Sequence, residues 1–234
     1  VGVPQFELYR KQKNQVDLIL FRKKMDIKKD QKIITYTASA KRVFPDEQVF
    51  IELLINKIND GIFGDTVLIL RLHPKERKEY YKKLYYNSKF PIRLDFPDSG
   101  FAANTESGKI NKDGINDFIC LILSSDVIIN LASTITLDSI LFDKPVICPK
   151  FNLKIPLNSW NAAGKWYNSS HFKHIIDYGA VSTPENMEEL QDMIMDYLND
   201  PTIKSSNRNQ LRQKMMPDIP TGKLISKSIL NVIN

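Results

Sequence analysis

Consecutive apolar residues, rather than alternating ones, form the short runs that recur along this chain of 234 residues. A strand that is apolar at successive positions is buried on both faces of its sheet. Such runs predict strands at residues 32–37, 66–72, 91–96, 126–131 and 144–149. The intervening segments predict helices at residues 46–59, 75–86, 113–125 and 134–142.

The alternation of strands with helices predicts the fold class. Parallel strands need long crossover connections, which helices supply, so the pattern is typical of an α/β fold with a Rossmann-like parallel sheet and helices on both faces. Towards the C-terminus the pattern becomes helical, at residues 184–198 and 223–233. Residues 17–29 have weaker helical character. Residues 151–170 show no period, and a loop of that length in a compact domain is usually functional.

Composition excludes several classes of protein. Apolar residues make up 42% and charged residues 26% of the chain, which excludes wholesale disorder and collagen-like repeats. No apolar run approaches the roughly 18 residues that span a bilayer. Cys120 and Cys148 lie in apolar runs, so we expect reduced core residues. The three histidines are scattered, so we expect no metal site.

The basic charge is concentrated at the N-terminal end of the chain. Residues 1–42 contain 11 Lys and Arg against 4 Asp and Glu, while the whole chain carries a net charge of +6. We interpret residues 1–31 as a basic linker and residues 32–234 as the Rossmann-like domain. The basic end suits an anionic membrane or a phosphorylated substrate, or is simply solvated. Its Lys-rich segment RKKMDIKKDQK lacks interleaved aromatic residues and no nucleic-acid fold motif appears, so no nucleic-acid partner is expected.

Candidate chemistry lies where the predicted strands end, because ligands of parallel α/β sheets bind beyond the carboxyl ends of the strands. Three such exits carry small, hydroxyl, acidic or basic side chains. The candidates are Ser39 and Lys41 at the first exit, Arg71, His73 and Pro74 at the second, and Ser133, Thr134 and Asp138 at the third.

The third exit favours an anion site, because backbone amides at a helix start, together with the hydroxyls of Ser133 and Thr134, can bind a phosphate. The alternative is a helix N-cap, worth about 1 kcal/mol. At the second exit, Pro74 restricts His73 to an extended backbone. The imidazole can then donate to a phosphate, act as a general acid or base, or cap the next helix. Arg71 faces the same side and can pair with a phosphate or a carboxylate.

Together the three exits favour a site for a nucleotide diphosphate. The chain contains no GxGxxG or Walker sequence, so the pattern does not point to a dinucleotide-dependent dehydrogenase or a P-loop enzyme.

The same residues carry a family resemblance. The run SSDVIINLASTITLDSILFDKPVICPKF, preceded by LILRLHPKE and followed by HFKHIIDYGAV, resembles the C-terminal, nucleotide-sugar-binding half of GT-B glycosyltransferases. It is most similar to bacterial surface-polysaccharide transferases and the related CDP-glycerol glycerophosphotransferases. Bacterial sialyl- and polysialyltransferases use similar motifs, so the nucleotide stays open. The resemblance covers residues 32–234.

The resemblance implies a donor-binding half that transfers a sugar from a nucleotide sugar to a surface polysaccharide or glycan. In these families an HP dipeptide and a pair of hydroxyl residues contact the donor's nucleotide and phosphates; here they are His73-Pro74 and Ser133-Thr134. His73 is the candidate catalytic residue. Asp138 is expected to bind the ribose, or simply to sit favourably near a helix N-terminus. The nucleotide sugar is a substrate, and we expect no cofactor.

The expected partners follow from the same resemblance. The acceptor is a glycan or a lipid-linked glycan, and an N-terminal acceptor domain is expected in the same chain or in trans. A cytoplasmic location is implied, with a weak electrostatic hold of the basic end on anionic lipid at the inner face of the membrane and no apolar insertion.

Two other functions stay open. A nucleotide-sugar epimerase of the same architecture would need acidic general bases in the cleft, and the sequence shows no clear pair. A non-catalytic module that binds a nucleotide sugar or a partner protein is the alternative from another class.

Overall fold

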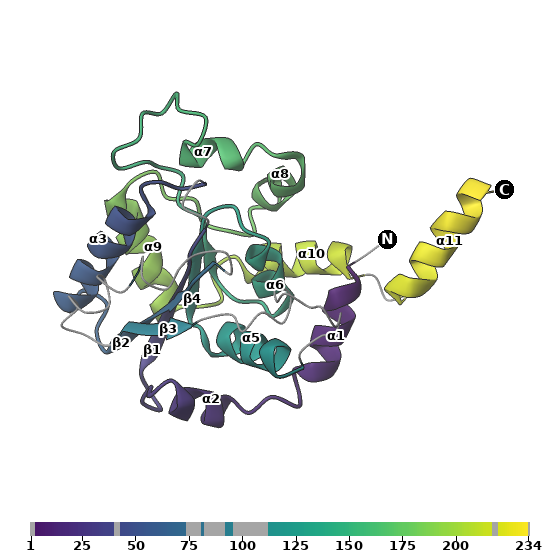
Figure 1. Cartoon of the computed structure of the whole chain (residues 1–234), viewed down its shortest axis with the longest axis horizontal. Coiled ribbons are helices and arrows are strands. Elements are labelled where there is room, and N and C mark those ends of the chain that lie inside the picture. Colours follow the sequence, from purple (N-terminus) through teal and green to yellow (C-terminus); the bar gives the residue numbers. More distant parts are fainter. Residues whose placement is uncertain are drawn as a thin grey trace.

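The structure, a computed structural model, describes residues 3–39, 43–73, 81, 92–95, 112–216 and 220–233 (Figure 1). Lys41, Pro74 and the predicted helix at residues 75–86, apart from Tyr81, lie outside the described residues. Among the described residues, no helix is both long enough and apolar enough to cross a membrane.

In the described part of the chain, five parallel strands form one sheet in the order β3-β2-β1-β4-β5. The strands are β1 (Lys32–Thr37), β2 (Thr66–Arg71), β3 (Ile92–Asp95), β4 (Val127–Asn130) and β5 (Val146–Ile147). Each lies within a predicted run, so the prediction of an α/β fold with a Rossmann-like sheet is confirmed. The strand order reverses between β1 and β4, and ligands of such sheets bind in the crevice at that point.

The predicted helices outside the undescribed segments are also present. They are α3 (Glu47–Asn59), α5 (Lys112–Ser124), α6 (Ile135–Leu141), α9 (Met187–Asn199) and α11 (Thr221–Ile233), while α2 (Leu18–Lys24) occupies the weakly helical stretch. Further helices, which the pattern did not predict, are α1 (Pro4–Gln12), α7 (Ala163–Trp166), α8 (Ser170–Asp177) and α10 (Ser205–Met215). The α7 helix is short and α1 and α10 are strongly polar, so their apolar residues show little periodicity. The α8 helix does bury Phe172 and Ile175 on one face, a helical spacing that the sequence analysis overlooked.

Helices cover both faces of the sheet, with α3 and α9 on one side and α1, α5 and α6 on the other (Figure 1). Successive side chains of one strand point to opposite faces of the sheet and so pack in opposite layers. Ile34 packs in the cluster that contains Phe50 of α3, whereas Ile33 packs with Leu121 of α5. All four side chains are at most 1% exposed, which explains why the strands read as unbroken apolar runs.

The basic N-terminal segment contributes two helices that pack on the domain. Phe6 and Tyr9 of α1 are buried in a cluster with Ile115 and Ile119 of α5. Phe21 of α2 is buried on the same side of the sheet. Residues 4–12 and 18–24 are therefore helices that pack on the domain, while the interpretation of residues 1–31 as a basic linker segment stays a prediction.

The two cysteines are buried and free, as expected from their apolar surroundings. Cys120 lies on α5 and Cys148 directly follows β5. Burial raises the pKa of the Cys148 thiol to about 12 and that of Cys120 to about 11, so both stay protonated near neutral pH.

Candidate functional site

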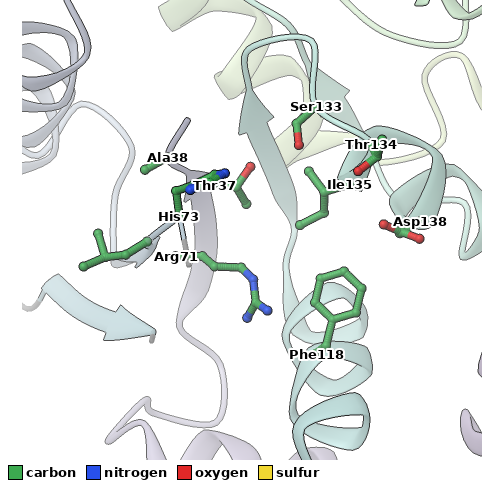
Figure 2. Close-up of a pocket in the computed structure, with 10 residues that line it drawn as sticks. Thr37, Ala38, Arg71, His73, Phe118, Ser133, Thr134, Ile135 and Asp138 are labelled. Carbon is green, nitrogen blue, oxygen red and sulfur yellow. The ribbon is translucent and has the colours of Figure 1, made fainter. Parts of the chain in front are cut away.

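A cavity of about 170 Å³ opens at the carboxyl ends of β1, β2 and β4. Ten residues line it: Thr37, Ala38, Arg71, Leu72, His73, Phe118, Ser133, Thr134, Ile135 and Asp138. Figure 2 shows Arg71 and His73 on one side of the cavity, with Ser133, Thr134 and Asp138 on the other. The structure thus brings candidates from the second and third strand exits into one place.

Arg71 ends β2 and contributes its guanidinium to this cavity. It forms an ion pair with Asp95, its register partner on β3, so the pairing with a carboxylate considered from the sequence is present. The guanidinium also lies over the Phe118 ring, 4.8 Å from its centroid. A cation held on two sides in this way keeps further N–H donors in a fixed plane, which suits a phosphate oxygen.

Asp138 is 5% exposed and lines the cavity one turn into α6. Its Oδ1 accepts a hydrogen bond of 3.1 Å from Nε2 of Gln5, a residue of α1. Burial raises the pKa of Asp138 to about 7, while the Gln5 hydrogen bond and the charge of Arg71 act in the opposite direction. Near neutral pH this carboxyl group can therefore accept or donate a hydrogen bond.

The turn between β4 and α6 is shaped by Asn130, the last residue of β4. Its Oδ1 accepts hydrogen bonds of 3.0 Å from the backbone N–H of Ser133 and from the Thr136 hydroxyl. The intervening Ala132 has a φ of 42°, in the left-handed region that L-residues rarely adopt. The Thr134 side chain makes no capping hydrogen bond to α6, so the N-cap alternative is not observed for its hydroxyl.

Two buried polar atoms beside the cavity lack a hydrogen-bond partner within the described residues. They are Oγ1 of Thr37, which lines the cavity, and Nδ2 of Asn130, and their residues are 7% and 0% exposed. Thr37 and Asn130 are register partners on β1 and β4. An unsatisfied buried polar group costs about 1–3 kcal/mol of stability. A polar ligand atom that bonded to the Thr37 hydroxyl would therefore remove this cost.

Ser39, a candidate at the first exit, lies beside the cavity residue Ala38 and bonds to Glu47. Its backbone N–H and its hydroxyl donate to Oε1 of Glu47, at 2.7 and 3.0 Å, and it is not among the cavity-lining residues. The hydroxyls of Tyr36 and Tyr81 donate to the same carboxylate, at 3.2 and 3.0 Å. Burial raises the pKa of Glu47 to about 7, despite these four donors.

Sequence reasoning missed several residues of the site. Thr37, Phe118 and Ile135 line the cavity, and Gln5 holds Asp138. Thr37 is the last residue of β1 and lies within the first strand exit, where the sequence analysis singled out Ser39 and Lys41 instead. Gln5 carried no signal, because its contact with Asp138 joins residues far apart in the chain.

Comparisons with known proteins show the fold. The chain matches no family model and no curated protein sequence. Among solved structures, it is similar to UDP-GlcNAc 2-epimerase from Neisseria meningitidis bound to UDP-GlcNAc, with a TM-score of 0.56 and 14% identity over 97% of this chain and 52% of that one. It is also similar to the wall teichoic acid polymerase TagF, with a TM-score of 0.52 and 15% identity over 93% of this chain and 48% of that one.

A third similar structure is a putative UDP-N-acetylglucosamine 2-epimerase from Listeria monocytogenes, with a TM-score of 0.51 and 10% identity over 91% of this chain and 46% of that one. The chain thus spans about half the length of these structures. Its parallel sheet with helices on both faces is the Rossmann-like fold of one half of a GT-B architecture, as predicted.

Proposed function

We propose that this chain is the donor-binding half of a GT-B glycosyltransferase. It moves a sugar from a nucleotide sugar to a bacterial surface polysaccharide or a related glycan. The observation that carries the proposal is that one cavity, at the point where the strand order reverses, is lined by several of the candidate residues: Arg71, His73, Ser133, Thr134 and Asp138. In support, one similar structure is bound to UDP-GlcNAc and another is a wall teichoic acid polymerase.

The proposed chemistry centres on the leaving nucleotide diphosphate. An acceptor hydroxyl attacks the anomeric carbon, the bond from that carbon to the β-phosphate oxygen breaks, and negative charge develops on the diphosphate. Arg71 and the hydroxyls of Ser133 and Thr134 donate to these oxygens, and His73 donates a hydrogen bond or a proton to them. Thr37 supplies a further hydroxyl, for which the described residues offer no hydrogen-bond partner.

The nucleoside end of the donor is assigned to Asp138. Its buried carboxyl group lines the cavity at the start of α6 and is held in place by Gln5. A ribose offers neighbouring hydroxyl groups that can donate to a carboxylate, and hydrogen bonds to charged groups contribute about 1.5–3 kcal/mol each. Asp138 therefore acts in this proposal on ribose binding and not on the diphosphate. Ser39 and Lys41 stay candidates for donor binding. Ser39 directly follows Ala38, which lines the cavity.

The proposed reaction needs further partners besides these 234 residues. The chain spans about half of each similar structure, and we propose that an acceptor-binding domain, in the same chain or in trans, completes the cleft. That domain holds the glycan or lipid-linked acceptor and supplies the base that takes the proton of the attacking hydroxyl. Positioning the two reactants accounts for much of the rate enhancement in such a transfer.

The test is calorimetry with UDP-, CMP-, CDP- and GDP-linked donors. We expect one nucleotide class to bind, and Ser133→Ala with Thr134→Val to weaken binding of its diphosphate more than binding of the free nucleoside. Ser226→Ala, an exposed serine of α11, is the matched control. Failure of every donor to bind would refute the proposal, and equal losses for diphosphate and nucleoside would remove the hydroxyl pair from the phosphate site.

Turnover separates the proposed transferase from its alternatives. Conversion of a UDP-linked sugar to its C2 epimer without acceptor would identify an epimerase. Donor binding that never leads to transfer, even with the completed cleft, would identify a non-catalytic module.

A further inference from the structure

Helix α2 presents exposed apolar side chains at the surface of the domain. Leu18, Ile19 and Leu20, which we call the α2 patch, are 36%, 83% and 60% exposed. The next residue, Phe21, is 6% exposed and packs in a cluster with Ile33 and Val67. The helix is therefore fixed to the core on one side while its first turn displays apolar groups to the outside.

Basic side chains follow the α2 patch on the same helix and flank it along the chain. Lys23 is exposed and follows Ile19 by four residues, so the two lie on the same face of the helix. Lys24, four residues after Leu20, is exposed and pairs with Asp117 of α5. Between residues 10 and 29 the chain holds eight Lys and Arg against two Asp. The exposed basic residues of this stretch are Arg10, Lys11, Lys13, Lys23, Lys24, Lys28 and Lys29.

We propose that the α2 patch docks the domain on an anionic lipid surface. Leu18, Ile19 and Leu20 enter the boundary between head groups and acyl chains, and Lys23 and Lys24 of the same helix lie at the level of the lipid phosphates. An exposed apolar first turn followed by exposed lysines distinguishes this surface from an ordinary solvated helix, which would carry polar residues at its exposed positions. Charge complementarity selects lipid as the occupant over a neutral protein surface.

The proposal changes the expectation drawn from the sequence, which was an electrostatic hold without apolar insertion. Electrostatic attraction alone is screened by salt, whereas burial of apolar groups is not. The two contributions together predict binding that weakens with salt but does not vanish. The docking does not depend on the proposed transferase activity, because no residue of the cavity takes part in it.

Docking through α2 also fixes the orientation of the cavity. Arg22 of α2 donates a hydrogen bond to the backbone carbonyl of Gln31, which directly precedes β1, so α2 lies near the amino end of that strand. The cavity lies at its carboxyl end. Figure 1 shows α2 at the edge of the molecule away from α7 and α8. A docked domain therefore opens its cavity away from the lipid, towards a substrate whose reacting end extends from the membrane.

Co-sedimentation with vesicles tests the proposal on the chain as described. The vesicles contain either phosphatidylcholine alone or equal parts of phosphatidylcholine and phosphatidylglycerol, at roughly 0.05 M and 0.5 M salt, where the Debye length falls from about 14 to about 4 Å. We expect binding to the anionic vesicles only, weakened but still measurable at high salt. Ile19→Ser with Leu20→Ser should weaken it at least tenfold at both salt concentrations.

Two variants provide the matched comparisons. Leu157→Ser removes a leucine that is 78% exposed outside α2, and its binding should equal that of the wild type. Lys23→Gln with Lys28→Gln and Lys29→Gln should abolish the preference for anionic vesicles. Because all the substituted side chains are exposed, we expect unchanged thermal midpoints, and the single variant Ile19→Ser serves if the double variant is less stable.

The outcomes that overturn the proposal are distinct. Wild-type binding by the Ile19→Ser, Leu20→Ser variant, or complete loss of wild-type binding at high salt, removes the apolar patch from the interaction. Absence of vesicle binding, combined with concentration-dependent self-association that Ile19→Ser abolishes, identifies the patch as an interface between copies of this chain. Donor calorimetry is independent of all these results.

Discussion

Glu47 makes the stability of this domain depend on pH, and Glu47→Gln should remove the part of that dependence that Glu47 causes. The pKa of Glu47 rises from an ordinary 4.5 to about 7 because its carboxyl group is buried. Between these two values the unfolded chain has already released the proton that the folded chain still holds. Stability therefore falls as the pH rises from about 4.5 to about 7, and the loss is complete above the folded pKa.

The magnitude follows from the two pKa values. A pKa unit corresponds to about 1.4 kcal/mol, so the ionised form of Glu47 costs the folded state about 3 kcal/mol above pH 7. In the Glu47→Gln variant, the new amide would keep an oxygen acceptor for the Ser39 N–H and hydroxyl, and its NH₂ group could donate to the Tyr81 hydroxyl in place of the present bond. Glu47→Gln should thus match the wild type near pH 4.5 and exceed its stability by about 3 kcal/mol at pH 8.

Urea unfolding at several pH values measures this difference. Asp138 also has a raised pKa, so its ionisation lowers the stability as the pH rises. Both proteins contain Asp138, so this effect cancels when the variant is compared with the wild type. Glu52→Gln, an exposed position on the same helix, is the control and should follow the wild type at every pH. A Glu47→Gln variant with the wild-type pH dependence, or one less stable than the wild type at pH 8, would refute the reasoning.

Three further predictions concern the proposed transfer reaction. His73→Ala should weaken donor affinity at least tenfold, or about 1.4 kcal/mol, with an unchanged fold; an unchanged dissociation constant removes His73 from the site. Asp138→Ala should weaken binding of the nucleoside and of the nucleotide diphosphate by the same factor, about tenfold, because the ribose is common to both; a loss confined to the diphosphate contradicts the ribose assignment. The chain alone should show little sugar transfer, and an added acceptor domain should restore it; robust transfer by the chain alone, measured with a labelled donor, would show that no second domain is needed.

The layered α/β architecture could be predicted from local sequence patterns alone. Runs such as residues 66–72 are apolar at successive positions because Val67 and Leu68 enter opposite layers, and this requirement is visible without any tertiary contact. Strand ends are equally local features. The rule that ligands bind beyond them therefore selected Arg71, His73 and Ser133 correctly as neighbours in one cavity, although their roles in binding stay predictions.

Helices with few apolar residues could not be predicted from the spacing of apolar positions. The α10 helix contains Arg208, which is fully buried, and a buried arginine is unfavourable unless it is paired. Its partners are Asp143 and the backbone carbonyls of Pro201 and Ile203. Asp143 follows α6 and lies far from α10 in the chain, so only the folded structure shows how the charge is compensated.

The contacts of the candidate residues also depend on packing between distant segments. Ser39 donates to Glu47, and Arg71 forms an ion pair with Asp95. Asp138 accepts a hydrogen bond from Gln5, which lies on a helix that the sequence pattern did not predict. Periodicity and strand ends depend on each residue's near neighbours, so they can be read along the chain. The hydrogen bonds and charges that orient a side chain come from segments that are brought together only by packing, and no local pattern encodes that choice of partner.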